Sequence, residues 1–361
     1  MTNKSSNQKL IKRFIEYIEI DSESGEEEQF AKRLIADLKK LGLTPTRDKI
    51  GNIFVNIKGE AANAPTILLN AHIDTVTPGK NIKPIIKGDK VQSDGTTILG
   101  ADNKAGVVAI IEALEIIKEE KIPHGNLLVV FTVQEETGLY GSKHIDRKKL
   151  KADFGFVFDG GGPETIHNAA PAQKNIEVWI KGKAAHAGVH PEQGINAIKV
   201  ASEAIAKMKQ GRIDFETTAN IGIISGGKAT NIIPEEVYVK GEARSHNPQK
   251  LKKQLDHMVG CFKNVCQKHR AKLKYKIIDM YPSFKIPAKH KIFSLASKPY
   301  TLKPSGGGSD ANMFNKYGIP SIILGAGAHD LHGVKERLSI KELVFGTKMI
   351  VGLIRQCSKK Q

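Results

Sequence analysis

Residues 68–76 read Leu68-Leu69-Asn70-Ala71-His72-Ile73-Asp74-Thr75-Val76, an apolar run that ends in a histidine and a carboxylate two residues apart. Residues two apart on a β-strand share a face, so we expect the side chains of His72 and Asp74 to point into one pocket. Four later segments each carry another carboxylate or histidine at the end of an apolar run or soon after it. This recurrence predicts a polar site built from several strand ends.

Helical and strand patterns alternate on both sides of this stretch. Apolar residues recur at helical spacing over residues 6–20 and 25–42, with Ser22 or Ser24 as candidate N-caps of the second helix. A third helix, starting near Asp102, is apolar nearly all round and is therefore expected to be buried. Short apolar runs are predicted to be buried strands at residues 53–57, 66–70, 127–133, 154–158 and 321–324.

This alternation is typical of an α/β fold with a mostly parallel sheet covered by helices. Ligands of such sheets bind at the carboxyl ends of the strands. That edge is where the pattern places His72, Glu135, Glu136 and Asp159.

The pattern changes between residues 172 and 283, where strand and helix signals follow the order βαββαβ. This order predicts an inserted α+β domain with an antiparallel, ferredoxin-like sheet. The first pattern then resumes and closes with a helix over residues 339–354. We therefore predict a discontinuous first domain, residues 1–171 and 284–361, and an insertion over residues 172–283.

Composition narrows the class of protein. The 361 residues contain no signal-peptide pattern and no apolar run long enough to span a membrane, so we expect a cytoplasmic protein without a membrane partner. Three cysteines are too few for a disulfide framework. A formal charge of +17 raises nucleic acid as a partner, but the lysines come in scattered pairs with few aromatic neighbours. We predict no nucleic-acid partner; such a charge would equally attract small anionic substrates.

Each polar residue at these strand ends also has an ordinary structural explanation. Asp102 suits a helix N-cap, Glu135 and Glu136 suit a solvated loop, and single histidines are seldom ligands. Taken together, however, three carboxylates and two imidazoles suit zinc or another borderline divalent ion. Two such ions would balance Asp102, Glu136, Asp159 and one hydroxide, whereas one ion would leave the pocket strongly negative.

The remaining acids then have roles around the ions. Asp74 can orient His72, and Glu135 can take the proton from a metal-bound water. Arg244 suits a bidentate carboxylate clamp or an ordinary surface ion pair. The backbone N–H groups of residues 306–309 suit either ligand binding or a flexible turn.

Six motifs in this order resemble the M20 metallopeptidases, most closely the peptidase T-like (tripeptide aminopeptidase-like) branch. They are LLNAHIDTV, GADNKAG, VQEETG, FDGGGP, GGGSDAN and HDLHGVKE, and the resemblance covers nearly the whole chain. It implies a zinc exopeptidase-like fold in which residues 172–283 form a lid and dimerisation domain.

The resemblance also implies roles for residues of the first domain. Asp102 would bridge two Zn²⁺ ions, for which Co²⁺ or Mn²⁺ are alternatives. His72 and Asp159 would complete one site, and Glu136 and His332 the other. Asp74 would be the orienting acid, and Glu135 the general base. His329 leaves the choice of histidine open, although the following Gly333 and Glu336 favour His332.

In the insertion, the segment KAAHAG resembles one whose histidine, here His186, reaches the partner subunit's site, which implies a homodimer through the inserted domain. Asn231 and Arg244 match positions that hold the substrate's backbone or terminal carboxylate, and Gly307, Gly308 and Ser309 are further candidates for substrate binding. We therefore expect a dizinc aminopeptidase acting on di- and tripeptides. One alternative is a deacylase or carboxypeptidase acting on N-acyl amino acids, and a more remote one is a basic, non-catalytic binding protein.

Overall fold

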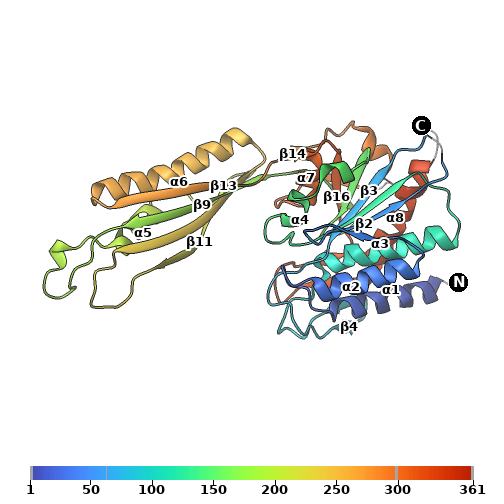
Figure 1. The fold of residues 1–361 in the computed structure, drawn as a ribbon, viewed down its shortest axis with the longest axis horizontal. Coiled ribbons are helices and arrows are strands. Elements are labelled where there is room, and N and C mark those ends of the chain that lie inside the picture. Colours follow the sequence, from blue (N-terminus) through green and yellow to red (C-terminus); the bar gives the residue numbers. More distant parts are fainter. Residues whose placement is uncertain (1–2, 62, 297–299, 359–361) are drawn as a thin grey trace. The chain divides into compact units, whose positions relative to one another are not determined.

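The computed structural model describes residues 3–61, 63–296 and 300–358, and Figure 1 shows the course of the chain. The chain divides into two compact units. The first comprises Met1–Ala169, Lys285–Ser305 and Ser309–Gln361, and the second comprises Ala170–Phe284 and Gly306–Gly308.

A mixed sheet forms the centre of the first unit. Its strands β6, β3, β7 and β16 are parallel neighbours, whereas β2 and β8 pair with this group in the antiparallel sense. The predicted mostly parallel sheet is thus confirmed at the centre. The full order is β1 (Thr46–Arg47), β2 (Ile53–Ile57), β6 (Leu127–Thr132), β3 (Ile67–His72), β7 (Phe154–Phe158), β16 (Ser321–Leu324), β8 (Thr165–Ala170) and β14 (Phe284–Lys285), with β15 (Thr301–Pro304) paired to β8.

Helices cover both faces of this sheet (Figure 1). On one face, Gly106 of α3 (Ala101–Glu119) approaches Ala71 so closely that an added Cβ would lie 3.2 Å from the alanine Cβ. The side chain of Asn70, the residue before, points to the other face and donates to Thr132. Thr132 in turn donates to Asp310 of α7 (Asp310–Lys316), so α7 lies on that second face. Burial on both faces explains why the central strands are apolar along most of their length.

Further helices and a second sheet belong to the first unit. The helices are α1 (Asn3–Ile18), α2 (Glu28–Lys40), α4 (Tyr140–Lys143) and α8 (Ile340–Ser358). A small second sheet has the order β17 (Ala328–His329), β18 (Arg337–Ser339), β5 (Lys90–Gln92) and β4 (Ile85–Lys87). Its strands β17 and β18 flank the loop that carries His332.

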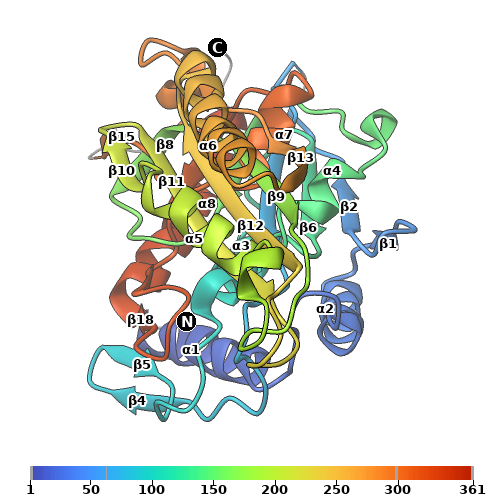
Figure 2. The same cartoon turned by 90° about the vertical axis from the view of Figure 1, so that its left-hand side faces the viewer.

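The second unit is an antiparallel sheet with two helices. The sheet order is β10 (Gly211–Asp214), β11 (Thr217–Gly226), β12 (Glu236–Ser245), β9 (Ala172–Lys181) and β13 (Lys272–Tyr281). Helices α5 (Ala197–Ala206) and α6 (Pro248–Lys268) lie side by side (Figure 2). Buried residues such as Val178 and Phe262 form one core between the sheet and these helices. The predicted βαββαβ order is present, with the short strand β10 added before β11.

Candidate metal centre

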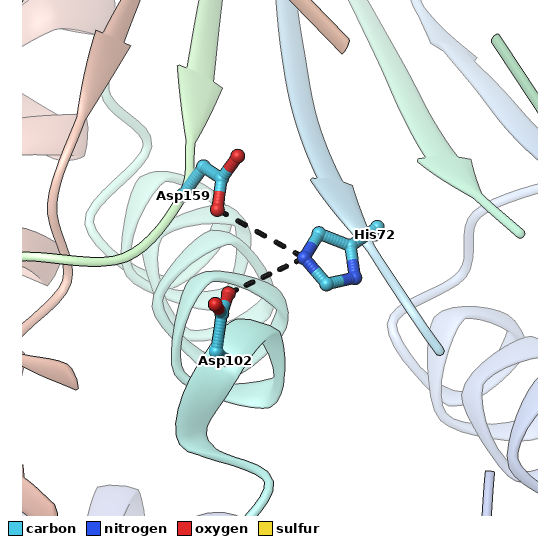
Figure 3. Close-up of side chains that lie close together, drawn as sticks. All are labelled: His72, Asp102 and Asp159. Atoms are coloured by element: carbon cyan, nitrogen blue, oxygen red, sulfur yellow. Dashed lines mark ion pairs between the residues drawn. The ribbon is translucent and has the colours of Figure 1, made fainter. Parts of the chain in front are cut away.

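Three side chains from different elements meet at the carboxyl edge of the main sheet (Figure 3). His72 ends β3, Asp159 directly follows β7, and Asp102 lies in the first turn of α3. His72 Nε2 is 3.3 Å from Asp102 Oδ1 and 3.9 Å from Asp159 Oδ1. Adjacent parallel strands thus bring two of these residues together, and the start of α3 brings the third.

A second group meets on the other side of Asp102. His332, in the loop between β17 and β18, has its Nε2 3.0 Å from Glu136 Oε1 and 3.4 Å from Asp102 Oδ2. Glu136 lies in the turn that follows β6. The two oxygens of Asp102 therefore face two different histidines, each accompanied by a further carboxylate.

These residues fit a pair of divalent cations. Asp102 Oδ1 is buried and has no hydrogen-bond partner among the described residues, although it lies 3.3 Å from His72 Nε2. Within the described residues, His72, Asp102 and Asp159 form one group whose possible ligand atoms lie within 4.8 Å of one another. Asp102, Glu136 and His332 form a second such group. Two imidazole nitrogens and three carboxylates make a donor set that zinc and similar ions accept.

Electrostatics at the site also favour a cation. Burial, reinforced by neighbouring carboxylates, raises the pKa of Asp159 well above its usual value and also raises that of Glu136. Hydrogen bonds to Asp102 and Glu136 raise the pKa of His332 to about 10. Burial opposes charge on His72, but the nearby carboxylates of Asp102, Asp74 and Glu135 outweigh it, so the pKa of His72 is raised as well. So many acids in one buried place need either protons or a cation.

Asp74 connects His72 to the turn that follows β6. The backbone carbonyl of Asp74 lies 3.0 Å from His72 Nδ1, at hydrogen-bond distance, and Asp74 Oδ1 lies 3.3 Å from the same nitrogen. Asp74 Oδ1 also accepts the backbone N–H of Glu135 at 2.9 Å. Its Oδ2 accepts the N–H of Glu136 at 3.1 Å. Asp74 thus orients the imidazole and fixes two consecutive glutamates at once.

Glu135 lies beside the proposed ion sites. Its side chain is in a residue that is 8 % exposed. One of its carboxylate oxygens lies within 4.8 Å of a ligand atom of His72 and of one of Glu136. Burial, reinforced by the charge of Asp159, raises its pKa well above the usual value. A carboxylate with a raised pKa suits proton transfer near neutral pH.

The two histidines of the HDLHGVKE segment lie apart. His329 Nε2 is 2.5 Å from Glu342 Oε2, at the start of α8. His332, by contrast, is next to Glu136 and Asp102. The geometry therefore favours His332 as the ligand.

In the second unit, His186 and Asn231 come from two segments that pair with each other. Ala187 N–H donates to the carbonyl of Asn231 at 3.0 Å, and Ile233 N–H donates to Ala185 at 2.9 Å. His186 Nδ1 accepts the backbone N–H groups of Gly188 and Val189, both at 3.1 Å. Neutral His186 must therefore carry its proton on Nε2, from which it can donate to a carbonyl oxygen.

Arg244 also belongs to the second unit and is held by a polar network. Its Nε and Nη2 donate to the two oxygens of Glu242 at 2.7 and 3.1 Å, and Gln173 Nε2 donates to Glu242 at 2.8 Å. A Cβ added to Gly307 would lie 3.9 Å from Arg244 Nη1, so the structure brings these two predicted residues together. At Gly308 an added Cβ would meet the ring of Tyr281 at 2.3 Å, which explains the need for glycine.

Ser309 has a structural task of its own. Its hydroxyl accepts the N–H of Ala311 at 3.2 Å, and its own N–H donates to Asn312 Oδ1 at 3.0 Å, which completes a capping box at the start of α7. Because both groups are occupied and the residue is 1 % exposed, Ser309 shapes this turn.

Two residues around the centre were missed as functional candidates. Ser24 donates to Asp74, and Glu336 accepts three backbone N–H groups at the start of α3. The sequence offered Ser24 only as a helix cap and Glu336 only as part of a motif. Both contacts join segments far apart in the chain, so local patterns carry no signal for them.

Comparisons with known proteins identify the family of this chain. Residues 68–356 match the sequence profile of peptidase family M20/M25/M40. The chain belongs to this family. The Bacillus subtilis protein YqjE is 40 % identical over 98 % of this chain and 100 % of its own length.

Two family structures are especially similar. A tripeptidase from Staphylococcus aureus has a TM-score of 0.91 and 38 % identity, with 98 % of this chain and 99 % of that chain covered. Aminopeptidase PepT from Bacillus cereus has a TM-score of 0.86 and 37 % identity over the same shares. The chain is thus a metallo-exopeptidase of the peptidase T-like branch of the M20 family. Among the described residues, no helix is both long and apolar enough to cross a membrane.

Proposed function

We propose that this chain is a dizinc aminopeptidase that releases the N-terminal residue of di- and tripeptides. The observation that carries the proposal is the position of Asp102, whose two oxygens face His72 on one side and His332 on the other. Two cations held there, with Asp159 and Glu136, would lower the pKa of a water molecule and polarise the scissile carbonyl. Co²⁺ or Mn²⁺ would suit the same donors.

The protein's own groups would then move protons and orient the substrate. Glu135 takes a proton from the attacking water and passes it to the leaving amine. Asp74 keeps His72 in one tautomer, because its backbone carbonyl accepts from Nδ1 and its carboxylate lies beside the same nitrogen. His186 donates from Nε2 to the carbonyl oxygen, while Asn231, Arg244 and the Gly307–Gly308 backbone hold the remainder of the peptide.

We further propose that residues 172–283 act as a lid and join two chains into a homodimer. Strand β10 pairs with β11 over residues 217–219, and no other described strand pairs with the later part of β11 on that side, which is therefore an open edge. Ile223 and Ile224 on this edge are each 51 % exposed. An open, apolar strand edge is a favourable place for pairing with a second copy. The cytoplasmic location stays a prediction.

One experiment separates this proposal from its alternatives. Protein purified without chelators is analysed for metal and then incubated with dipeptides, tripeptides and N-acetyl amino acids, with mass spectrometry of the products. Two metal ions per chain and release of the N-terminal residue would support the proposal. Cleavage of only the N-acetyl compounds would favour the deacylase, and neither metal nor turnover would favour a non-catalytic protein.

A further inference from the structure

Glu336 is a buried carboxylate with three backbone partners and no role in the reaction above. It is 1 % exposed. Its Oε2 accepts the N–H groups of Leu99 and Gly100, and its Oε1 accepts the N–H of Asp102, each at 2.8 Å. These donors lie in the segment that leads into α3, where Asp102 and Asn103 have non-helical backbone angles, and the regular helix that follows is capped by Asn103, whose Oδ1 accepts the N–H of Gly106 at 3.2 Å.

We propose that Glu336 is a positioning residue that holds the two metal sites in register, by joining the segment of Asp102 to the loop of His332. The inference rests on the proposed function, in which both residues are ligands. Glu336 lies four residues after His332, and its own N–H donates to Gly333 at 2.9 Å, which closes the end of that loop. One side chain thus connects the two segments.

A carboxylate is well suited to this position. Backbone N–H groups that converge on one place carry partial positive charge there, and a carboxylate accepts charge-assisted hydrogen bonds from them. Its two oxygens can accept several hydrogen bonds at once. Glutamine has nearly the same size but only one acceptor oxygen, so its NH₂ group would face at least one backbone N–H and leave it unsatisfied.

The two metal sites should depend on Glu336 to different degrees. His72 and Asp159 stand at the ends of the central strands β3 and β7, whose hydrogen bonds fix them independently. His332 stands on a loop, is 53 % exposed, and has a positive φ of 61°. Without Glu336, the distance between Asp102 and His332 is free to vary, and we expect the site of Glu136 and His332 to weaken more than the other.

The test is cobalt binding to metal-free protein, followed by calorimetry and by the visible d–d spectrum. Wild type is expected to bind two equivalents. In Glu336→Gln the second equivalent should bind about 10- to 100-fold more weakly, with an altered spectrum, while the first changes little. Glu336→Ala should show a larger loss. The control is Glu342→Gln, since Glu342 pairs with His329 outside the centre and should leave both equivalents unchanged.

The outcomes separate this inference from the function on which it rests. Circular dichroism and thermal melting of the metal-free variants show how much protein is folded. If Glu336→Gln lowers the melting temperature but the folded protein binds both equivalents with wild-type affinity and spectrum, Glu336 only stabilises the fold and the inference is wrong. If wild type itself binds no cobalt, the proposed function fails and the inference falls with it.

Discussion

Ser24 Oγ donates a 2.6 Å hydrogen bond to Asp74 Oδ2, across 50 residues of sequence. The backbone N–H of Ser24 also donates to Thr75 at 3.1 Å, so the segment before α2 is tied to the end of β3. Asp74 is fully buried. Although burial raises the pKa of Asp74, the bonds from His72 and Ser24 outweigh it and keep the carboxyl ionised. Ser24 therefore helps to fix the acid that orients His72.

Replacing Ser24 by alanine should lower kcat/KM about 10-fold. This is the lower end of the usual loss when a residue that supports a metal ligand is removed. The reason is that one oxygen of Asp74 loses a partner inside the protein. Ser22→Ala is the matched control, because the buried hydroxyl of Ser22 has no hydrogen-bond partner in the part of the chain that the structure describes. Equal losses in both variants would show that Ser24 acts through packing alone.

Glu135→Gln should reduce turnover by about 10²- to 10⁴-fold, the usual contribution of a general base. Metal content should stay at the wild-type value, since Glu135 is not among the proposed ligands. Glu136→Gln provides the contrast, because it should lose metal as well as activity. Elemental analysis beside steady-state kinetics checks both, and near-normal turnover in Glu135→Gln would exclude the assigned role.

Metal binding should release protons, and its apparent affinity should rise from pH 5 to pH 8. In the metal-free protein the pKa of His332 is raised to about 10, so its imidazole holds a proton that a cation must displace, and the pKa values of Asp159 and Glu136 are raised as well. Lower pH favours the protonated ligands and therefore opposes binding. Calorimetry at one pH in buffers of different ionisation enthalpy counts the protons, and an affinity independent of pH would contradict the proposed ligand set.

The central fold could be predicted because long apolar runs in the sequence mark its strands and its buried helix. Strands buried on both faces, such as β6 and β7, are apolar without interruption, and α3 is apolar nearly all round. Strands at the side of the sheet were missed. The sequence of β8, Thr165–Ala170, mixes polar and small residues, and β15 has four residues that end in proline. Their pairing depends on partners more than a hundred residues away.

The same reasoning separates what was found at the site from what was missed. Proposed ligands stand at the ends of strong strands, or in recognisable motifs, so their positions were visible in the sequence. The expectation that Ser22 or Ser24 caps α2 was wrong: the N-cap is Glu27, without a side-chain hydrogen bond, and Ser24 serves Asp74 instead. A serine near the start of a helix is easily interpreted as an N-cap from the local sequence. Only the tertiary structure shows whether its hydroxyl bonds to the helix backbone or to a distant side chain.

Arg244 should matter for substrate affinity more than for the chemical step. Glu242 occupies two of its donors, and Gln173 holds Glu242, so the guanidinium is fixed beside Gly307. Arg244→Lys should raise KM for tripeptides about 10-fold with a smaller change in kcat, because lysine lacks the planar fork. Arg212→Lys, an exposed arginine on β10, is the control. A fall in kcat alone would contradict a substrate-binding role.

Mixing two inactive variants tests whether His186 acts on the partner subunit's site. His186→Ala and Glu135→Gln should each be nearly inactive when pure. If His186 serves the partner's centre, a mixed dimer has one complete site, formed by the Glu135 of one chain and the His186 of the other. Random reassociation makes half of the dimers mixed, so about a quarter of wild-type activity should return. Sedimentation establishes that subunits exchange, and exchange without recovery would place His186 in its own subunit's site or outside catalysis.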